Sequence, residues 1–326
     1  MGSLAGWLEG WLEGWLAVVP RVGASRCRGT RSHIVHPHRA PTVPNWQQRT
    51  PGCRLVARCS VTAAYSRKMS ETDPSRSDTP GNDTPGNDTP GNDGVSVERD
   101  GDVLVVHLDD GKANALSAAM IAGISAALDH AEADHTIGAV VLHGRPGRFC
   151  AGFDLSVMRG VDLGAVVTLV SDGGELVRRL YGAPVPIVAA STGHALAAGA
   201  LILLGCDIRI GADVDCKIGL NEVAIGMVLP AWALTIAQDR LSRRHIQLAV
   251  ATAQVTAGAG AVDAGFLDSV APETEVLSVA VAAAHTLAAL DGRAYASTVL
   301  ALRGPVLAQM AVQITADREA MSAPGV

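Results

Sequence analysis

The stretch STGHALAAGALILLGCDIRI, residues 191–210, joins two candidate strands through a short helix. An aliphatic run, VPIVAAS at 185–191, leads into it, and a second run, DIRIGA at 207–212, ends it. Between them, small residues open a helical pattern over 198–205. Near-continuous aliphatic strands separated by helices are typical of parallel strands that are buried on both faces. This stretch therefore predicts an α/β fold.

The same alternation continues on both sides of this stretch. Ser117, for example, is placed to cap an Ala-rich helical pattern that follows a strand candidate. The further candidates are strands at 103–108 (VLVVHL) and 138–144 (GAVVLHG), and helices at 173–181, 232–241 and 243–254. After about residue 272 the chain is Ala-rich and helical, without a strand candidate. We predict an α/β core at 95–272 and a C-terminal helical region at 273–326.

The first 68 residues differ from the rest in charge. They hold ten Lys or Arg and two acids, which leaves 16 basic and 30 acidic residues for the remainder of the 326-residue chain. This composition fits a transit peptide, but it also fits an extension outside the working protein, which we favour because Met69 offers a natural start. The apolar run GWLEGWLEGWLAVV is too short and too interrupted to span a bilayer. The TPGND repeats within 69–94 predict a disordered linker.

Several motifs that mark common chemistries are missing from the sequence. It contains no GxGxxG after a strand, no GxxxxGK[ST], no HExxH and no GxSxG. The six cysteines form no CxxC and no ligand-like spacing with histidine, so we expect a reduced, cytoplasmic protein without a metal site. The histidines His107, His130, His135 and His143 lie in strand or helix patterns without an acidic or Cys partner at a fixed offset. We interpret them as surface or hydrogen-bonded histidines.

Two turns rich in small residues remain as candidates for chemistry. One is GRPGRFCAGFDL at 144–155, and the other is the turn at the start of the 198–205 helix. Backbone N–H groups exposed at a turn and at a helix N-terminus can hold a developing oxyanion without using side chains. Glu222, in GLNEVAIG at 219–226, is a third candidate because it stands among aliphatic and small residues. A carboxylate buried there would have a raised pKa, whereas a solvated loop acid would not.

Taken together and in this order, four segments resemble the crotonase superfamily, the enoyl-CoA hydratase/isomerase family. They are FCAGFDL, GHALAAGALILLGCDIRIG, IGLNEVAIGMVLP and LSRRHIQLAVATAQVTAGAGAVDAGFLDSVAP. The resemblance covers nearly all of 95–272 and implies a spiral of ββα units that binds an acyl-CoA thioester. The tail resembles, less specifically, that family's C-terminal helical trimerisation region, which implies a homotrimer or a dimer of trimers.

The resemblance also assigns roles to individual positions. It implies an oxyanion hole made by the backbone N–H groups of Phe153 and Ala198, with Glu222 as the catalytic base and proton shuttle. Asp154 follows the first donor and is expected to hold the loop. Further acyl-CoA-binding positions are implied at Ala113, Ala151, Leu155, Gly199, Leu201 and Trp232, the last as a wall of the acyl pocket or as an ordinary core Trp. The family needs no cofactor beyond the coenzyme A of its substrate, and no nucleic acid or membrane partner.

The sequence departs from the hydratase pattern at Leu201. Hydratases have a second glutamate at this place, three residues after the second oxyanion donor, and share the handling of water between two carboxylates. A single glutamate with an apolar residue here resembles the isomerases that convert 3-enoyl-CoA to 2-enoyl-CoA. A hydratase or other crotonase-type activity and a non-catalytic acyl-CoA binder stay open as alternatives. Alanines also replace glycines before Gly199, so we expect Ala198 to take an ordinary helical or bridge conformation, or the hole to be distorted.

Overall fold

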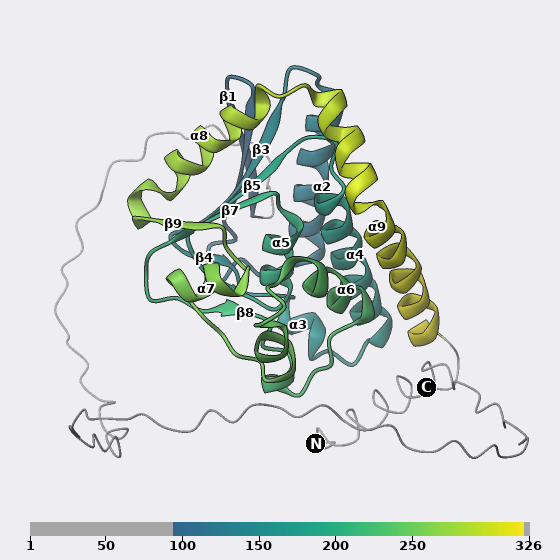
Figure 1. The fold of residues 1–326 in the computed structure, drawn as a ribbon. Helices are drawn as coiled ribbons and strands as arrows, with labels where there is room; N and C mark the ends of the chain where they lie inside the picture. The colour runs from purple at the N-terminus through teal and green to yellow at the C-terminus, as the bar shows by residue number, and fades with distance from the viewer. Residues whose placement is uncertain (1–93, 323–326) are drawn as a thin grey trace, which may run out of the picture. The chain divides into compact units, whose positions relative to one another are not determined.

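The computed structural model describes residues 94–322, with side chains as far as residue 319. The predicted extension at 1–68 lies outside the described residues. The predicted linker at 69–94 does so too, apart from Gly94. Element labels follow Figure 1.

A six-stranded sheet runs through the described part of the chain. It contains β1 (Val95–Asp100), β2 (Val103–Leu108), β3 (Ala139–Gly144), β5 (Ile187–Ser191), β7 (Ile208–Ala212) and β9 (Ser269–Ala271). The strand order is β1-β2-β3-β5-β7-β9. β1 is antiparallel to β2, and all other neighbours are parallel. The predicted strands are confirmed as β2, β3, β5 and β7, within two residues at each end.

A second sheet is small and entirely parallel. It consists of β4 (Gly147–Cys150), β6 (Gly193–Leu196) and β8 (Ile218–Gly219), in the order β4-β6-β8. Successive strands alternate between the two sheets, because β3, β5 and β7 belong to the large sheet whereas β4, β6 and β8 belong to the small one. A helix follows each such pair, so the expected spiral of ββα units is confirmed.

Helices cover both faces of the large sheet (Figure 1). The α-helices are α2 (Ala118–Ala133), α3 (Leu155–Met158), α4 (Leu163–Tyr181), α5 (Ala198–Gly205), α6 (Ala231–Arg240), α7 (Gly258–Ala264), α8 (Val276–Ala288) and α9 (Gly292–Ser322). Shorter helical turns are η1 (Val223–Ile225), η2 (Gln247–Ala251) and η3 (Glu273–Glu275). Ser117 caps α2 as predicted, its hydroxyl accepting from the Met120 N–H. The helix expected over 243–254 is wrong in extent, because only Ile246 and the π-helical turn η2 are helical, and Ala253 then takes a φ of 51°.

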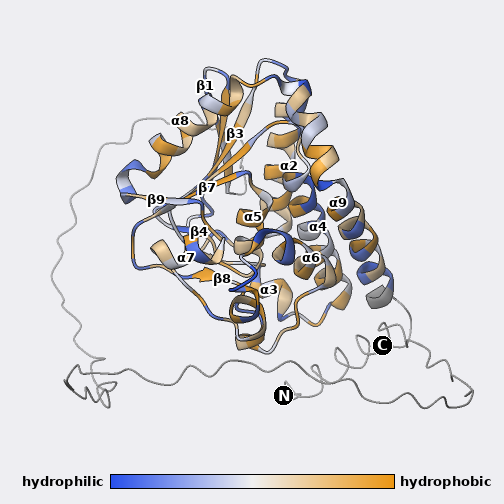
Figure 2. Ribbon diagram, viewed as in Figure 1, coloured by the Kyte–Doolittle hydropathy of each residue, from blue (hydrophilic) through white to orange (hydrophobic). Residues whose placement is uncertain are grey.

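Side chains alternate between two hydrophobic layers along the central strands. Val103 and Val105 of β2 pack with α8 on one face, whereas Leu104 and Val106 point to the other face and join the core with α2, α4 and α5. Apolar residues line the inward surfaces of these elements (Figure 2). This alternation follows from the period of two in a β-strand, so each strand contributes to both layers.

The C-terminal helix α9 lies along α4 and α6 of the same chain (Figure 1). The Arg303 guanidinium anchors it by donating to the Asp207 carboxylate at 2.6 Å and to the Tyr181 carbonyl at 2.8 Å. In residues 94–322, α9 is the one helix long and apolar enough to cross a membrane. Length and composition alone are weak evidence, since packed helices of soluble proteins meet the same criteria. Apolar side chains on its outer surface stay exposed, namely Leu300, Leu302 and Val312.

The connection from β6 to α5 contains a strained residue. Ala197 has φ 50° and ψ −120°, a combination that glycine adopts readily and alanine does not. The next residue, Ala198, begins α5 in a helical conformation, which is one of the two outcomes expected from the sequence. The substitution of alanine for glycine therefore places the strain on Ala197 and leaves Ala198 regular.

We predict that Ala197→Gly stabilises the protein by about 1 kcal/mol. Relief of a strain of roughly 1–3 kcal/mol should exceed the extra entropy that glycine adds to the unfolded chain, about 0.4–1 kcal/mol. Urea unfolding of the variant against the parent protein measures the difference. Ala200→Gly, inside α5, is the matched control and should destabilise by about 1 kcal/mol or more. A loss of stability in Ala197→Gly would show that the backbone here is not strained.

Candidate functional site

The predicted site residues gather at one edge of the small sheet. Phe153 follows the end of β4 by three residues, Ala198 follows β6 by two, and Glu222 follows β8 by three. Because the three strands are parallel neighbours, their carboxyl ends lie side by side, which is where open α/β sheets commonly bind ligands. Three residues that are far apart in sequence are thus brought to the same edge.

Backbone hydrogen bonds to Leu116 fix the residues on both sides of Phe153. The Leu116 N–H donates to the Gly152 carbonyl at 2.8 Å, and the Asp154 N–H donates to the Leu116 carbonyl at 3.2 Å. Gly152 has φ 97°, which turns the chain between them. Phe153 lies in a loop. Among the loop and turn hydrogen bonds of residues 94–322, none is donated by the Phe153 N–H.

Ala198 starts α5 close to the Phe153 loop. A Cβ built on Gly152 would lie 3.7 Å from the Ala198 nitrogen, so the loop and the helix start are in contact. Gly199 makes this approach possible, since a Cβ there would lie 2.1 Å from the Cys150 carbonyl oxygen. As the first residue of a helix, Ala198 has an N–H without an intrahelical acceptor, at the positive end of the helix dipole. The two predicted donors therefore lie near each other.

Glu222 is a buried acid without an ionic partner in the described part of the chain. Its side chain is 7% exposed, and its Oε2 atom is buried without a hydrogen-bond partner. Burial raises its pKa to about 7. Its backbone carbonyl accepts from the N–H groups of Ile225 (3.0 Å) and Met227 (2.9 Å), which fixes the turn that holds it. Of the two possibilities that the sequence offered for Glu222, a buried carboxylate or a solvated loop acid, the structure shows the buried carboxylate.

Leu201 and Trp232 complete an apolar interior beside this edge. Leu201 lies one turn after Ala198 and is 1% exposed. Trp232, on α6, is fully buried and packs against Gly174 of α4, where a Cβ would lie 2.8 Å from its ring. The adjacent Gly173 packs against the Phe153 ring in the same way, at 2.4 Å. A glycine pair on α4 thus links the two aromatic residues.

The remaining predicted positions lie nearer the surface. The Asp154 carboxylate caps α3 by accepting from the Ser156 N–H at 2.8 Å, which agrees with a loop-holding role. Ala151 is exposed, and its N–H donates to the Asn114 carbonyl at 3.3 Å. Ala113 is partly exposed in the facing loop, and Leu155 is 50% exposed. These positions lie around the Phe153 loop, whereas Trp232 lies deeper.

Sequence reasoning missed Asn114, which ties the loop after β2 to β4. Asn114 is 1% exposed with φ 53°, and its side-chain amide donates to the Leu108 carbonyl at 2.6 Å and to the Phe149 carbonyl at 3.3 Å. Asparagine tolerates this left-handed conformation better than most residues. The asparagine in KANALS was visible in the sequence, but its partner near Phe149 is 35 residues away.

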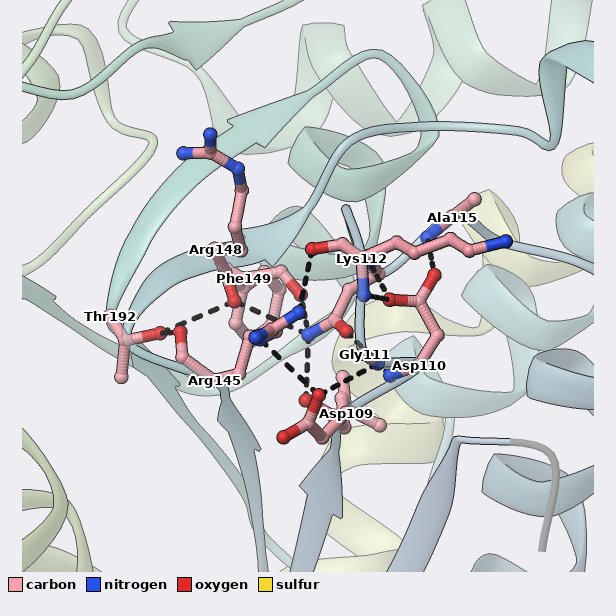
Figure 3. A network of polar contacts seen from close by, with 11 residues as sticks. Asp109, Asp110, Gly111, Lys112, Ala115, Arg145, Arg148, Phe149 and Thr192 are labelled. Carbon is pink, nitrogen blue, oxygen red and sulfur yellow. Dashed lines mark hydrogen bonds and ion pairs between the residues drawn. The ribbon is translucent and has the colours of Figure 1, made fainter. Parts of the chain in front are cut away.

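Figure 3 shows the charged shell around this loop. The Asp110 carboxylate accepts from the backbone N–H groups of Lys112 (2.7 Å), Asn114 (2.8 Å) and Ala115 (3.0 Å). Burial alone would raise the pKa of Asp110, but these hydrogen bonds lower it. Arg145 pairs with Asp109 at 3.2 Å and donates to the Lys112 carbonyl at 2.8 Å. The loop that faces Ala151 is therefore fastened by hydrogen bonds and an ion pair.

This arrangement has the parts for enolate chemistry. Two backbone N–H groups close together can stabilise an oxyanion, and a carboxylate with a pKa near 7 can accept and return a proton at neutral pH. Within residues 94–322, no group of three or more His, Cys, Asp or Glu side chains is arranged to hold a metal ion.

Comparison with known proteins places this arrangement in a family. The family model for enoyl-CoA hydratase/isomerase matches residues 98–325. Human mitochondrial enoyl-CoA delta isomerase 1 is 31% identical over 228 residues, which are 68% of this chain and 75% of the human protein. A probable enoyl-CoA hydratase of Bacillus subtilis is 31% identical over 225 residues, covering 64% of this chain and 85% of the relative.

A solved structure supports the same relationship. The apo structure of the enoyl-CoA isomerase of Mycobacterium tuberculosis is 38% identical, with a TM-score of 0.65, and covers 71% of this chain and 99% of its own. The fold, the sequence order of the site segments and these matches point to the same family. This chain belongs to the enoyl-CoA hydratase/isomerase family.

Proposed function

We propose that this protein shifts the double bond of a 3-enoyl-CoA to position 2, with Glu222 as the proton shuttle. The observation that carries the proposal is the buried carboxylate of Glu222 at the same edge of the small sheet as the Phe153 and Ala198 N–H groups, with Leu201 in place of a second acid one turn beyond Ala198. Hydration needs a water held between two carboxylates, whereas double-bond migration needs one base. Relatives named as isomerases and as hydratases have similar identities, so the choice depends on the residues of the site.

In the proposed reaction, Glu222 removes a proton from C2 of the bound thioester. The electron pair moves onto the thioester oxygen, and the N–H groups of Phe153 and Ala198 stabilise the resulting enolate. Glu222 then returns its proton to C4, so that the double bond between C3 and C4 becomes one between C2 and C3. A pKa of about 7 suits a group that must act as base and then as acid. Coenzyme A enters as part of the substrate, and the step uses no further cofactor.

The first functional prediction concerns Glu222→Gln. This variant keeps the shape of the side chain but removes the base, so isomerisation of 3-enoyl-CoA should fall by about 10²–10⁴-fold or more. Product analysis by chromatography measures the rate, and calorimetry with a saturated acyl-CoA checks that thioester binding is retained. Isomerisation at the parent rate would contradict the proposed base.

The same variant makes a prediction about stability and pH. The pKa of Glu222 is about 7 in the folded protein and near 4.5 otherwise, so the folded state binds the extra proton between these values. Stability contributed by this group therefore falls as pH rises from 4.5 to 7. Glu222→Gln should be more stable than the parent protein at pH 8, by up to about 3 kcal/mol, and about equally stable near pH 4.5. Urea unfolding at the two pH values tests the sign, and a constant difference would refute it.

Leu201→Glu tests why this chain should isomerise and not hydrate. The new acid would lie on the α5 face one turn beyond Ala198, where it could share a water with Glu222. Weak hydration of 2-enoyl-CoA should appear and isomerisation should fall, and the buried charge should destabilise the protein by a few kcal/mol. Strong hydration by the parent protein, assayed in parallel, would favour the hydratase alternative. Tight binding without turnover of either substrate would favour a non-catalytic acyl-CoA binder.

We also propose self-assembly through the C-terminal region. Leu300, Leu302 and Val312 are each about two-thirds exposed or more on the outer side of α9, which is more apolar surface than one helix normally leaves in water. Family resemblance suggests three subunits or six. Light scattering at micromolar concentration should give a trimer or hexamer, and a monomer would refute the proposal.

A further inference from the structure

Three helices meet beside the aromatic pair formed by Phe153 and Trp232. At this place α4 contributes Ser171 and Gly174, α6 contributes Trp232, and α9 contributes Asp317; we call these four residues the α4–α6–α9 junction. Asp172, next to Ser171, pairs with Arg318, next to Asp317, at 2.9 Å. Gly174 packs on Trp232, with a built Cβ 3.0 Å from Nε1. Helices α4, α6 and α9 lie together in Figure 1.

The junction concentrates buried polar atoms without partners. Within residues 94–322, seven buried side-chain polar atoms make no hydrogen bond, and three of them belong to the junction: Ser171 Oγ, Trp232 Nε1 and Asp317 Oδ2. Ser171 is 2% exposed and Trp232 is fully buried. A buried polar atom left unpaired costs about 1–3 kcal/mol, so three in one place indicate that something else pairs with them.

Ser171 lacks the backbone bond that several helical threonines make. Thr168, Thr252, Thr286, Thr298 and Thr315 donate to the carbonyl four residues earlier, at 2.6–3.0 Å, whereas Ser278 donates to the carbonyl three residues earlier and Thr235 to the Gln313 side chain. Ser171 lies inside α4, where the same bond is available, yet it does not make it. Since Ser171 is one turn before Gly174, it shares the helix face that meets Trp232.

The chemistry of the three atoms defines a complementary group. Trp232 Nε1 can only donate, an ionised Asp317 can only accept, and Ser171 can do either. Burial raises the pKa of Asp317 to about 6 although the Ala231 N–H lowers it, so the carboxyl is mostly ionised at neutral pH. A hydroxyl accepts from the indole and donates to the carboxylate, whereas an alkyl chain can do neither and a second carboxylate is repelled.

We propose that the α4–α6–α9 junction is a subsite for a hydroxyl group on the acyl chain, remote from the thioester. This inference rests on the proposed function, because the chain would enter past Phe153 and Trp232. The substrates would then be unsaturated acyl-CoA thioesters with a hydroxylated chain, supplied by a hydroxylating or hydrating reaction on the fatty chain.

Calorimetry with saturated acyl-CoA thioesters tests this without turnover. The probes are plain, terminally hydroxylated and terminally carboxylated chains over a series of matched lengths. At one or more lengths the hydroxylated thioester should bind about tenfold tighter than the plain one, and the carboxylated thioester should bind more weakly. Ser171→Ala and Asp317→Ala should each reduce the preference for hydroxyl and leave plain-chain binding nearly unchanged. Thr168→Ala, which removes a hydroxyl from α4 outside the junction, should keep the preference.

Two results would count against the subsite in different ways. Equal binding of plain and hydroxylated chains at every length, or a preference that survives both junction variants, would overturn the subsite alone. Failure to bind any acyl-CoA would overturn the proposed function, and the subsite with it.

Discussion

The contact between Gly199 and the Cys150 carbonyl is the constraint on which the site depends. A Cβ at position 199 would lie 2.1 Å from the Cys150 carbonyl oxygen, so no side chain larger than hydrogen fits there. Helix α5 can therefore begin against the end of β4 only with glycine at this position. That approach brings the Ala198 N–H beside the Phe153 loop, and the Ala197 N–H then bonds to the Gly219 carbonyl at 3.0 Å, which ties in the segment leading to Glu222. One close backbone contact therefore sets the relative positions of the two N–H groups and the acid.

Sequence reasoning predicted the large sheet better than the small one, for a physical reason. β2, β3, β5 and β7 are aliphatic runs buried on both faces, and burial of that kind leaves a local signal. β6 (GHAL) and β8 (IG) are short and show no periodicity, because their pairing with neighbours, and not their composition, makes them strands. The early start of α4 at Leu163 was missed as well, although Asp162 caps it.

The same distinction applies to the site. Phe153, Ala198 and Glu222 were identified because each belongs to a contiguous motif that resembles a family pattern. Asn114 and Asp317 were not, because their roles depend on partners brought near by folding: the β4 backbone for Asn114, and the start of α6 for Asp317. The burial of Glu222, which gives its unusual acidity, likewise follows from the packed elements around it and not from its neighbours in sequence.

The alternation of strands between two sheets separates stability from chemistry within each repeat. The central strands of the large sheet are buried on both faces, while the site residues follow the ends of the short strands of the small sheet. Exchanging a few residues just past β4, β6 or β8 can therefore alter the reaction without disturbing the strands that hold the protein together. Such a scaffold is open to diversification, because the residues after the short strands can change the chemistry while the ββα units keep the same fold.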